Sequence, residues 1–153
     1  MHCYHLNETE MKSFATTMAH YLEPATIIFL KGELGVGKTT FVRAVLNSLG
    51  HHDKVKSPTY ALVEPYCING INLFHFDLYR INNAQELYFI GMDEYFSPNS
   101  ICLIEWPEKA GAFLPIPDII FSLTFSHDIR ELAIETHTDK GKKLLDQTIV
   151  NFR

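Results

Sequence analysis

The segment from Phe29 to Phe41, FLKGELGVGKTTF, constrains the fold of this chain more than any other. It contains the complete pattern G-x-x-x-x-G-K-[ST], which runs from Gly32 to Thr39. A short apolar run of strand-forming residues, ATIIFL, precedes it, and the helical pattern KTTFVRAVLNSL follows it and ends at Gly50. A buried strand, a glycine-rich turn and the start of a helix are therefore predicted in that order, which is the arrangement of a phosphate-binding loop.

The chemistry of this loop predicts which residues contact a nucleotide. Glycines let the backbone wrap with its N–H groups turned inward, and the helix N-terminus adds partial positive charge where phosphate oxygens lie. Lys38 is expected to reach the β and γ phosphates, and Thr39 to place its hydroxyl on Mg²⁺. ATP and Mg²⁺ are therefore the expected cofactors. Adenine is expected rather than guanine, because no N/T-K-x-D loop for reading guanine occurs. The predicted cofactor-binding residues of this segment are Gly32, Gly35, Val36, Gly37, Lys38, Thr39 and Thr40.

Two acidic residues close apolar strands elsewhere in the chain. Glu105 ends ICLIE, and Asp77 ends LFHFD. Because Mg²⁺ takes oxygen ligands, one acid is expected to hold the metal while the other orients the attacking water, and the sequence leaves open which does which. The predicted catalytic residues are Asp77, Glu105 and Lys38, and the predicted metal ligands are Thr39, Glu105 and Asp77. Thr59, in the Pro-containing loop KSPTYALVEPY, is the candidate for a switch that senses the γ phosphate.

The remaining patterns predict an α/β fold of three layers, similar to P-loop nucleotide hydrolases, around a mixed parallel and antiparallel central sheet. Asn7 and Glu10 have the spacing of a capping box at a helix start, and Asn69-Gly70 is typical of a tight hairpin turn. A second hairpin is expected around His127-Asp128. Strands are predicted near residues 2–6, 25–30, 60–66, 71–79, 101–106, 119–125 and 130–137, and helices over 8–22, 38–49, 83–96 and from 142 onward. We expect one domain spanning residues 1–153, since no linker or repeat interrupts the chain.

Composition excludes several classes of protein. The chain is 46% hydrophobic and 20% charged with a net charge of −5, which is typical of a globular protein and unfavourable for direct binding to a nucleic acid backbone. The three cysteines are far apart, without the paired spacing of a disulfide framework or a zinc site. No apolar run reaches the roughly twenty residues of a membrane span, and the start does not read as an export signal. A cytoplasmic protein without membrane contact is expected.

Two other functions share the phosphate loop and remain open on these residues alone. A small kinase usually clamps two phosphates with several arginines and a mobile lid, whereas the four arginines of this chain form no lid-like cluster. A binding module that docks on a partner when ATP is bound, without productive hydrolysis, would need the same loop. The fate of the γ phosphate separates the kinase from the hydrolase.

The motifs taken together resemble the bacterial TsaE family. The resemblance rests on GELGVGKTTFVRAVLNSLG, VKSPTYALVEPY, FHFDLYR, ELYFIGMDEYF and CLIEWPE, which follow one another in that order between about Thr26 and Trp106. Family motif positions correspond to Lys38 and Thr39 in the phosphate loop, Thr59 in the SPT loop, Asp77 in the HxDLYR segment, and Glu105 with Trp106 in the IEWPE segment. The tail from Pro115 to Arg153 resembles the family only in its layout of hairpin and helix.

This resemblance implies a specific role in tRNA modification. TsaE proteins are P-loop ATPases required to form threonylcarbamoyladenosine (t6A) at the adenosine 3′ of the anticodon. The resemblance implies that the chain binds a threonylcarbamoyl-transferase complex of TsaD and TsaB-like subunits and hydrolyses Mg-ATP so that this complex can turn over. The tRNA would then be handled mainly by the partner, in agreement with the negative net charge. Slow intrinsic hydrolysis accelerated by the partner is a further expectation, because trans-acting groups raise rates by roughly 10³ to 10⁵ in other P-loop enzymes.

Overall fold

The computed structural model describes residues 1–55, 58 and 60–152. Seven strands form one sheet in these residues: β1 (His2–Leu6), β2 (Ile27–Lys31), β3 (Val63–Ile68), β4 (Ile71–Asp77), β5 (Ser100–Glu105), β6 (Ile119–Ser126) and β7 (Ile129–Thr136). The helices are α1 (Glu8–Ala19), α2 (Lys38–Ser48), α3 (Glu86–Phe89) and α4 (Asp139–Asn151). Short 3₁₀ turns lie at η1 (Met92–Tyr95), η2 (Pro107–Lys109) and η3 (Gly111–Phe113). None of the helices in the described residues is long and apolar enough to span a membrane.

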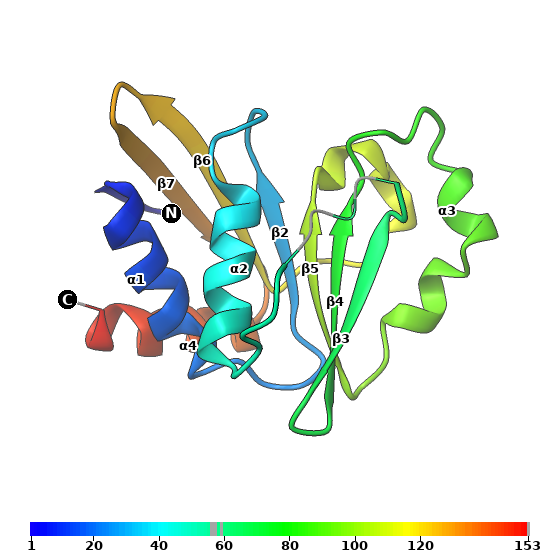
Figure 1. The fold of residues 1–153 in the computed structure, drawn as a ribbon, viewed down its shortest axis with the longest axis horizontal. Helices are drawn as coiled ribbons and strands as arrows, with labels where there is room; N and C mark the ends of the chain where they lie inside the picture. The colour runs from blue at the N-terminus through cyan, green and yellow to red at the C-terminus, as the bar shows by residue number, and fades with distance from the viewer. Residues whose placement is uncertain (56–57, 59, 153) are drawn as a thin grey trace.

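The sheet is mixed, as predicted. Its strand order is β1-β7-β6-β2-β5-β4-β3 (Figure 1). The central pairs β4–β5, β5–β2 and β2–β6 are parallel, whereas β1–β7, β7–β6 and β4–β3 are antiparallel. Because parallel strands point the same way, the carboxyl ends of β2, β4 and β5 meet at one edge of the sheet. Ligands of open α/β sheets bind at this edge.

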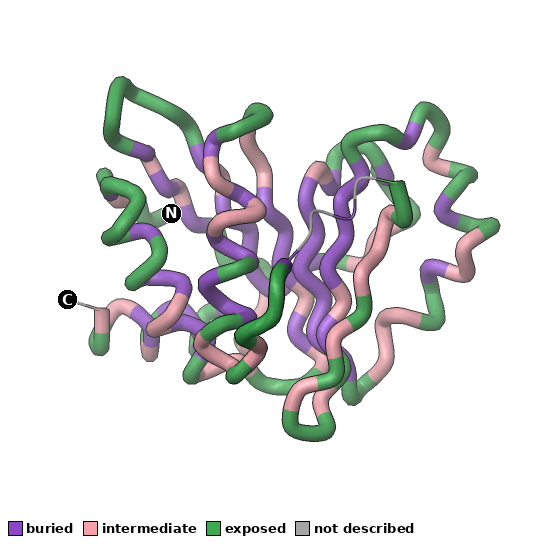
Figure 2. Tube along the Cα trace, viewed as in Figure 1, coloured by how far each residue is buried: buried purple, intermediate pink, exposed green. Residues whose placement is uncertain are grey.

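Side-chain alternation along the central strands divides the core in two. Leu30, Leu103 and Phe121 face α1, α2 and α4 in the larger cluster. Phe29, Ile104 and Ile120, each one position away, face the opposite side, where α3, the 3₁₀ turns and their loops pack. The α/β class with helices on both faces of the sheet is therefore confirmed, although the second face is covered by short elements. Figure 2 shows that burial is concentrated along the central strands.

Local signals account for most element boundaries. The capping box forms, because the Asn7 side chain accepts from the Glu10 N–H at 2.9 Å and the Glu10 carboxylate accepts from the Asn7 N–H at 2.8 Å. Asn69 and Gly70 both have positive φ, 52° and 79°, as a tight hairpin turn requires. The second hairpin turns at His127, which has a φ of 59°.

Three predicted helices differ from the structure, and the first of them ends at Ala19 rather than at residue 22. The continuous helix over 83–96 is wrong: α3 covers one turn, and Gly91, at a φ of 69°, breaks the path before η1. The last helix begins at Asp139, three residues earlier than predicted. Thr138 caps it by accepting from the Gly141 N–H at 3.0 Å. The pattern of apolar residues did not reveal this start because the first turn of α4 is mostly polar.

Candidate functional site

The loop from Gly32 to Gly37 joins the end of β2 to the start of α2. Gly32 lies so close to the β6 backbone that a Cβ would sit 2.5 Å from the Leu123 carbonyl oxygen, which explains the need for glycine. Gly37 caps α2 with a φ of 118°, and its position has no side-chain cap. The first N–H groups of α2 are therefore not satisfied by a capping side chain, which leaves them suited to an anion.

Lys38 lies in the interior of the loop rather than in solvent. Its side chain is buried, and the ammonium donates to the carbonyl oxygens of Gly32 and, at 2.9 Å, Glu33. The same Nζ lies 4.5 Å from the centroid of the Trp106 ring. Burial lowers the pKa of Lys38, and the nearby carboxylates, Glu105 foremost, oppose this shift. A cation held this way is able to exchange its carbonyl partners for phosphate oxygens.

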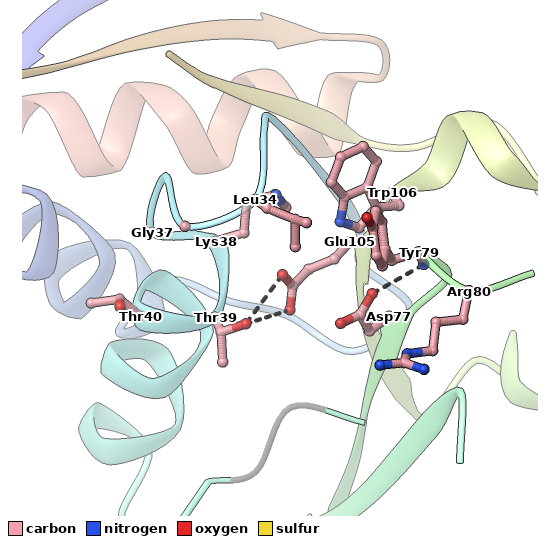
Figure 3. Close-up of a pocket in the computed structure, with 11 residues that line it drawn as sticks. Leu34, Gly37, Lys38, Thr39, Thr40, Asp77, Tyr79, Arg80, Glu105 and Trp106 are labelled. Carbon is pink, nitrogen blue, oxygen red and sulfur yellow. Dashed lines mark hydrogen bonds between the residues drawn. The ribbon is translucent and has the colours of Figure 1, made fainter. Parts of the chain in front are cut away.

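Thr39 and Glu105 meet across the gap between α2 and β5. The Thr39 hydroxyl donates to the two carboxylate oxygens of Glu105 at 3.1 and 3.2 Å (Figure 3). Glu105 is 3% exposed, so the charge of its carboxylate would be poorly screened by water. The sequence-predicted loop threonine and strand-end acid are thus placed together.

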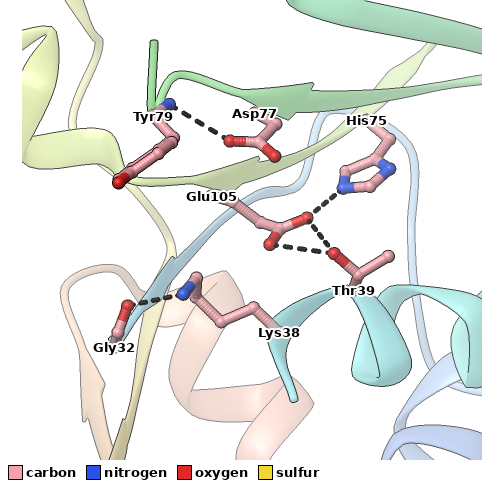
Figure 4. Close-up of polar contacts among 7 residues, drawn as sticks. All are labelled: Gly32, Lys38, Thr39, His75, Asp77, Tyr79 and Glu105. Carbon is pink, nitrogen blue, oxygen red and sulfur yellow. Dashed lines mark hydrogen bonds and ion pairs between the residues drawn. The ribbon is translucent and has the colours of Figure 1, made fainter. Parts of the chain in front are cut away.

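His75 is a residue of this cluster that the sequence analysis did not single out. It is fully buried on β4, and its Nε2 lies 2.5 Å from a Glu105 carboxylate oxygen (Figure 4). Among the described residues its Nδ1 has no hydrogen-bond partner. A signal was available, because residues two apart on a strand share a face, so His75 must lie on the same side of β4 as Asp77.

Asp77 ends β4 directly beside Glu105, its register partner on β5. One Asp77 carboxylate oxygen accepts from the backbone N–H of Tyr79 at 3.1 Å, which holds the turn after the strand (Figure 4). The side chain is 8% exposed and borders the same cavity as Thr39. The two predicted acids are therefore neighbours at the carboxyl edge of the sheet, each with a different set of contacts.

These side chains surround a cavity of about 380 Å³ at the carboxyl ends of β2, β4 and β5 (Figure 3). Trp106 forms one wall with a left-handed backbone, φ 58°, and its ring centroid lies 5.0 Å from that of Tyr79. Of the predicted cofactor-binding residues, Gly32 and Val36 are not part of the cavity lining, and Thr59 falls outside the described residues. The cavity lining consists of Leu34, Gly35, Gly37, Lys38, Thr39, Thr40, Asp77, Tyr79, Arg80, Glu105 and Trp106.

The oxygen atoms at this cavity fit Mg²⁺ better than a metal held entirely by protein. No cluster of three or more His, Cys, Asp or Glu side chains able to hold a metal occurs in residues 1–55, 58 and 60–152. Mg²⁺ is usually held by one or two protein groups together with water and substrate phosphates. The Thr39 hydroxyl and the carboxylates of Glu105 and Asp77 offer such a partial set beside the loop that carries the G-x-x-x-x-G-K-[ST] pattern.

Comparisons with known proteins give one consistent result. A sequence model of the family described as threonylcarbamoyl adenosine biosynthesis protein TsaE matches residues 5–138. The chain is 44% identical over 135 residues to the tRNA threonylcarbamoyladenosine biosynthesis protein TsaE of Haemophilus influenzae, covering 88% of this chain and 85% of that protein. Identity to the Bacillus subtilis protein of the same name is 36% over 110 residues, 72% of this chain and 68% of the relative. The crystal structure of Bacillus subtilis YdiB superposes with a TM-score of 0.84 at 25% identity, covering 99% of this chain and 96% of that one.

Proposed function

Because this chain belongs to the TsaE family of proteins that act in the biosynthesis of threonylcarbamoyladenosine in tRNA, we propose that it binds Mg-ATP and hydrolyses it in support of threonylcarbamoyl transfer by partner proteins. The observation that carries this proposal is the contact of the Thr39 hydroxyl with both oxygens of Glu105, next to the buried ammonium of Lys38. A loop threonine, a loop lysine and a strand-end acid are the parts that P-loop hydrolases use for phosphate and metal.

The geometry supports a division of labour between the two acids. Thr39 and Glu105 would hold Mg²⁺, because their oxygen atoms already meet at the start of α2 and the end of β5. Asp77 would orient the attacking water and accept its proton, because it borders the cavity from the neighbouring strand β4. Lys38 binds the β and γ phosphate oxygens in place of the loop carbonyls. Bound Mg²⁺ neutralises charge on the phosphates.

The partner complex completes the reaction in this proposal. Arg80 lines the cavity and packs its guanidinium 4.7 Å from the Tyr60 ring centroid, so it is held by a neighbour rather than extended over the loop. Groups supplied or arranged by the threonylcarbamoyl-transferase subunits, TsaD and TsaB-like proteins, would then raise the hydrolysis rate. Contact with tRNA falls mainly to those subunits, because the chain carries a net charge of −5.

Three measurements test the proposal. Hydrolysis of Mg-ATP is followed with the purified chain alone and with the transferase pair, and t6A formation is followed in the reconstituted system with and without the chain. We expect a faster rate with the pair, and t6A formation that depends on the chain. Labelled γ phosphate should appear as free phosphate. Its transfer to a small molecule would support a kinase, and equal rates with and without the pair would refute partner activation.

Variants separate hydrolysis from binding. Glu105→Gln and Asp77→Asn preserve side-chain volume and should lower hydrolysis by about 100-fold or more while ATP still binds. Glu94→Gln is the matched control, because it removes the same charge at a residue that is exposed on η1. Full t6A formation by a hydrolysis-deficient Glu105→Gln protein would favour the binding module without productive hydrolysis.

A further inference from the structure

Arg130 connects the C-terminal hairpin to the phosphate loop. It lies at the start of β7, 94 residues from Val36 in sequence, and its Nε donates to the Val36 carbonyl oxygen at 2.8 Å. The residue is 8% exposed, and its guanidinium lies 4.6 Å from the centroid of the Phe125 ring. A second donor, Nη2, reaches the Glu8 carboxylate on α1 at 3.3 Å. A buried cation is thus aimed at one backbone oxygen of the loop.

That oxygen determines the direction of an N–H group. The Val36 carbonyl and the Gly37 N–H belong to one planar trans peptide, so they point in opposite directions. With the carbonyl directed at Arg130, the Gly37 N–H is directed away from Arg130, and Gly37 lines the cavity whereas Arg130 does not. The glycine cannot enforce this direction by itself, because its backbone adopts many conformations. A Cβ on Gly37 would lie 3.1 Å from Arg130 Nε, which shows how closely the two pack.

We infer that Arg130 is a positioning residue for the phosphate site, and that Glu8 holds its guanidinium in place. It fixes the peptide between Val36 and Gly37 so that the N–H faces a bound phosphate. The inference rests on the proposed function, since it concerns binding of Mg-ATP in this loop. Among the described residues Arg130 does not line the cavity, and it contacts the loop at the Val36 carbonyl, so it acts through the loop backbone.

A purely structural role would have a different signature. Arg130 joins β7, α1 and the loop, so its removal destabilises the fold on either account. If its role were only structural, the protein that remains folded would bind nucleotide normally. If it orients the Gly37 N–H toward the β phosphate, the folded protein would bind ATP and ADP more weakly. AMP binding would change little, because AMP has no β phosphate for that N–H to contact.

The test compares Arg130→Gln with Arg130→Lys and with Arg43→Gln. Arg43 is exposed on α2, so its variant is the matched control for loss of one positive charge. Unfolding without nucleotide is measured first, and Kd values for Mg-ATP, Mg-ADP and AMP are then measured by calorimetry where each variant is folded. We expect Arg130→Gln to weaken ATP and ADP binding about tenfold, Arg130→Lys to stay within about threefold of wild type, and Arg43→Gln to match it.

The outcomes separate this inference from the proposed function. Wild-type protein that binds no Mg-ATP overturns the proposed function. Wild-type binding with an unchanged Kd in Arg130→Gln overturns the inference and leaves the function standing. If Arg130→Gln does not fold, NMR of the wild-type protein decides: a slowly exchanging Nε–H of Arg130 supports the contact with Val36, and exchange as fast as that of Arg43 overturns it.

Discussion

Asp118 joins three elements at the edge of the sheet opposite the phosphate loop. One carboxylate oxygen accepts from the Ile27 N–H at the start of β2, at 2.8 Å, and the other accepts from the Thr138 hydroxyl at 2.6 Å. The Asp118 backbone adds an N–H bond to the Ile27 carbonyl at 2.8 Å and accepts from the His137 N–H at 2.9 Å. The residue is 7% exposed. Its carboxylate therefore ties β2 and the cap of α4 to the start of β6.

Asp118→Ala should be among the more destabilising single changes in this chain. It removes two hydrogen bonds to a charged acceptor, worth about 1.5–3 kcal/mol each, and leaves the N–H of the half-buried Ile27 without that partner. Thr138 still accepts from Gly141, so the cap of α4 is not lost entirely. We therefore expect a loss of about 4 kcal/mol in the free energy of unfolding. For a chain of 153 residues this corresponds to a drop in Tm of about 8–16 °C.

Thermal and urea unfolding followed by circular dichroism measure this loss. Asp118→Asn keeps one acceptor oxygen and should lose about half as much. Asp146→Ala is the control, because Asp146 is exposed on α4 and should stay within about 0.5 kcal/mol of wild type. Nucleotide affinity of the folded Asp118→Ala protein should be unchanged, since Asp118 lies at the far end of β2 from the loop. A loss below about 1 kcal/mol would refute the assignment of these bonds as a structural clamp.

Three further outcomes are expected. In urea unfolding, the stability of His75→Phe should stay within about 2 kcal/mol of wild type, because the change removes an unsatisfied Nδ1 as well as the Glu105 bond. The same variant should hydrolyse ATP about tenfold more slowly, because the Glu105 carboxylate loses its His75 contact. Unchanged hydrolysis would contradict this. Burial raises the pKa of Cys102 to about 12, so its thiol stays protonated below that pH. Mass spectrometry should therefore find Cys102 unlabelled by iodoacetamide at neutral pH, while the two exposed cysteines react. Trp106 is the only tryptophan, so a change in protein fluorescence can be assigned to it. Its fluorescence should change on addition of Mg-ATP, because the Lys38 ammonium beside its ring would move to bind phosphate, and it should not change in Lys38→Ala.

Most of the elements could be predicted because their signals are local. The capping box at Asn7, the hairpin at Asn69-Gly70 and the apolar run that becomes β5 each depend on residues adjacent in sequence. The helix predicted over 83–96 failed for a physical reason. Its apolar residues have helical spacing, but Gly91 adopts a left-handed conformation that ends α3 after one turn.

The candidate site divides in the same way. Lys38 and Thr39 could be named from the loop pattern alone, and Asp77 and Glu105 from their positions at strand ends. The contact of His75 with Glu105 could not be derived, because it depends on β4 and β5 lying side by side.

The sequence by itself determined the glycine turn, the helix that follows it and the family to which the chain belongs, since these depend on short patterns of backbone freedom, capping and apolar spacing. The tertiary structure decided the strand order, and with it which side chains meet around the loop. Arg130 shows the difference, because no pattern near it in sequence indicates a contact with Val36. The two residues meet only because β7 pairs with β6 and β6 pairs with β2. Pairing between distant strands is selected by burial of the whole core rather than by neighbouring residues, so it becomes visible only when the chain is folded.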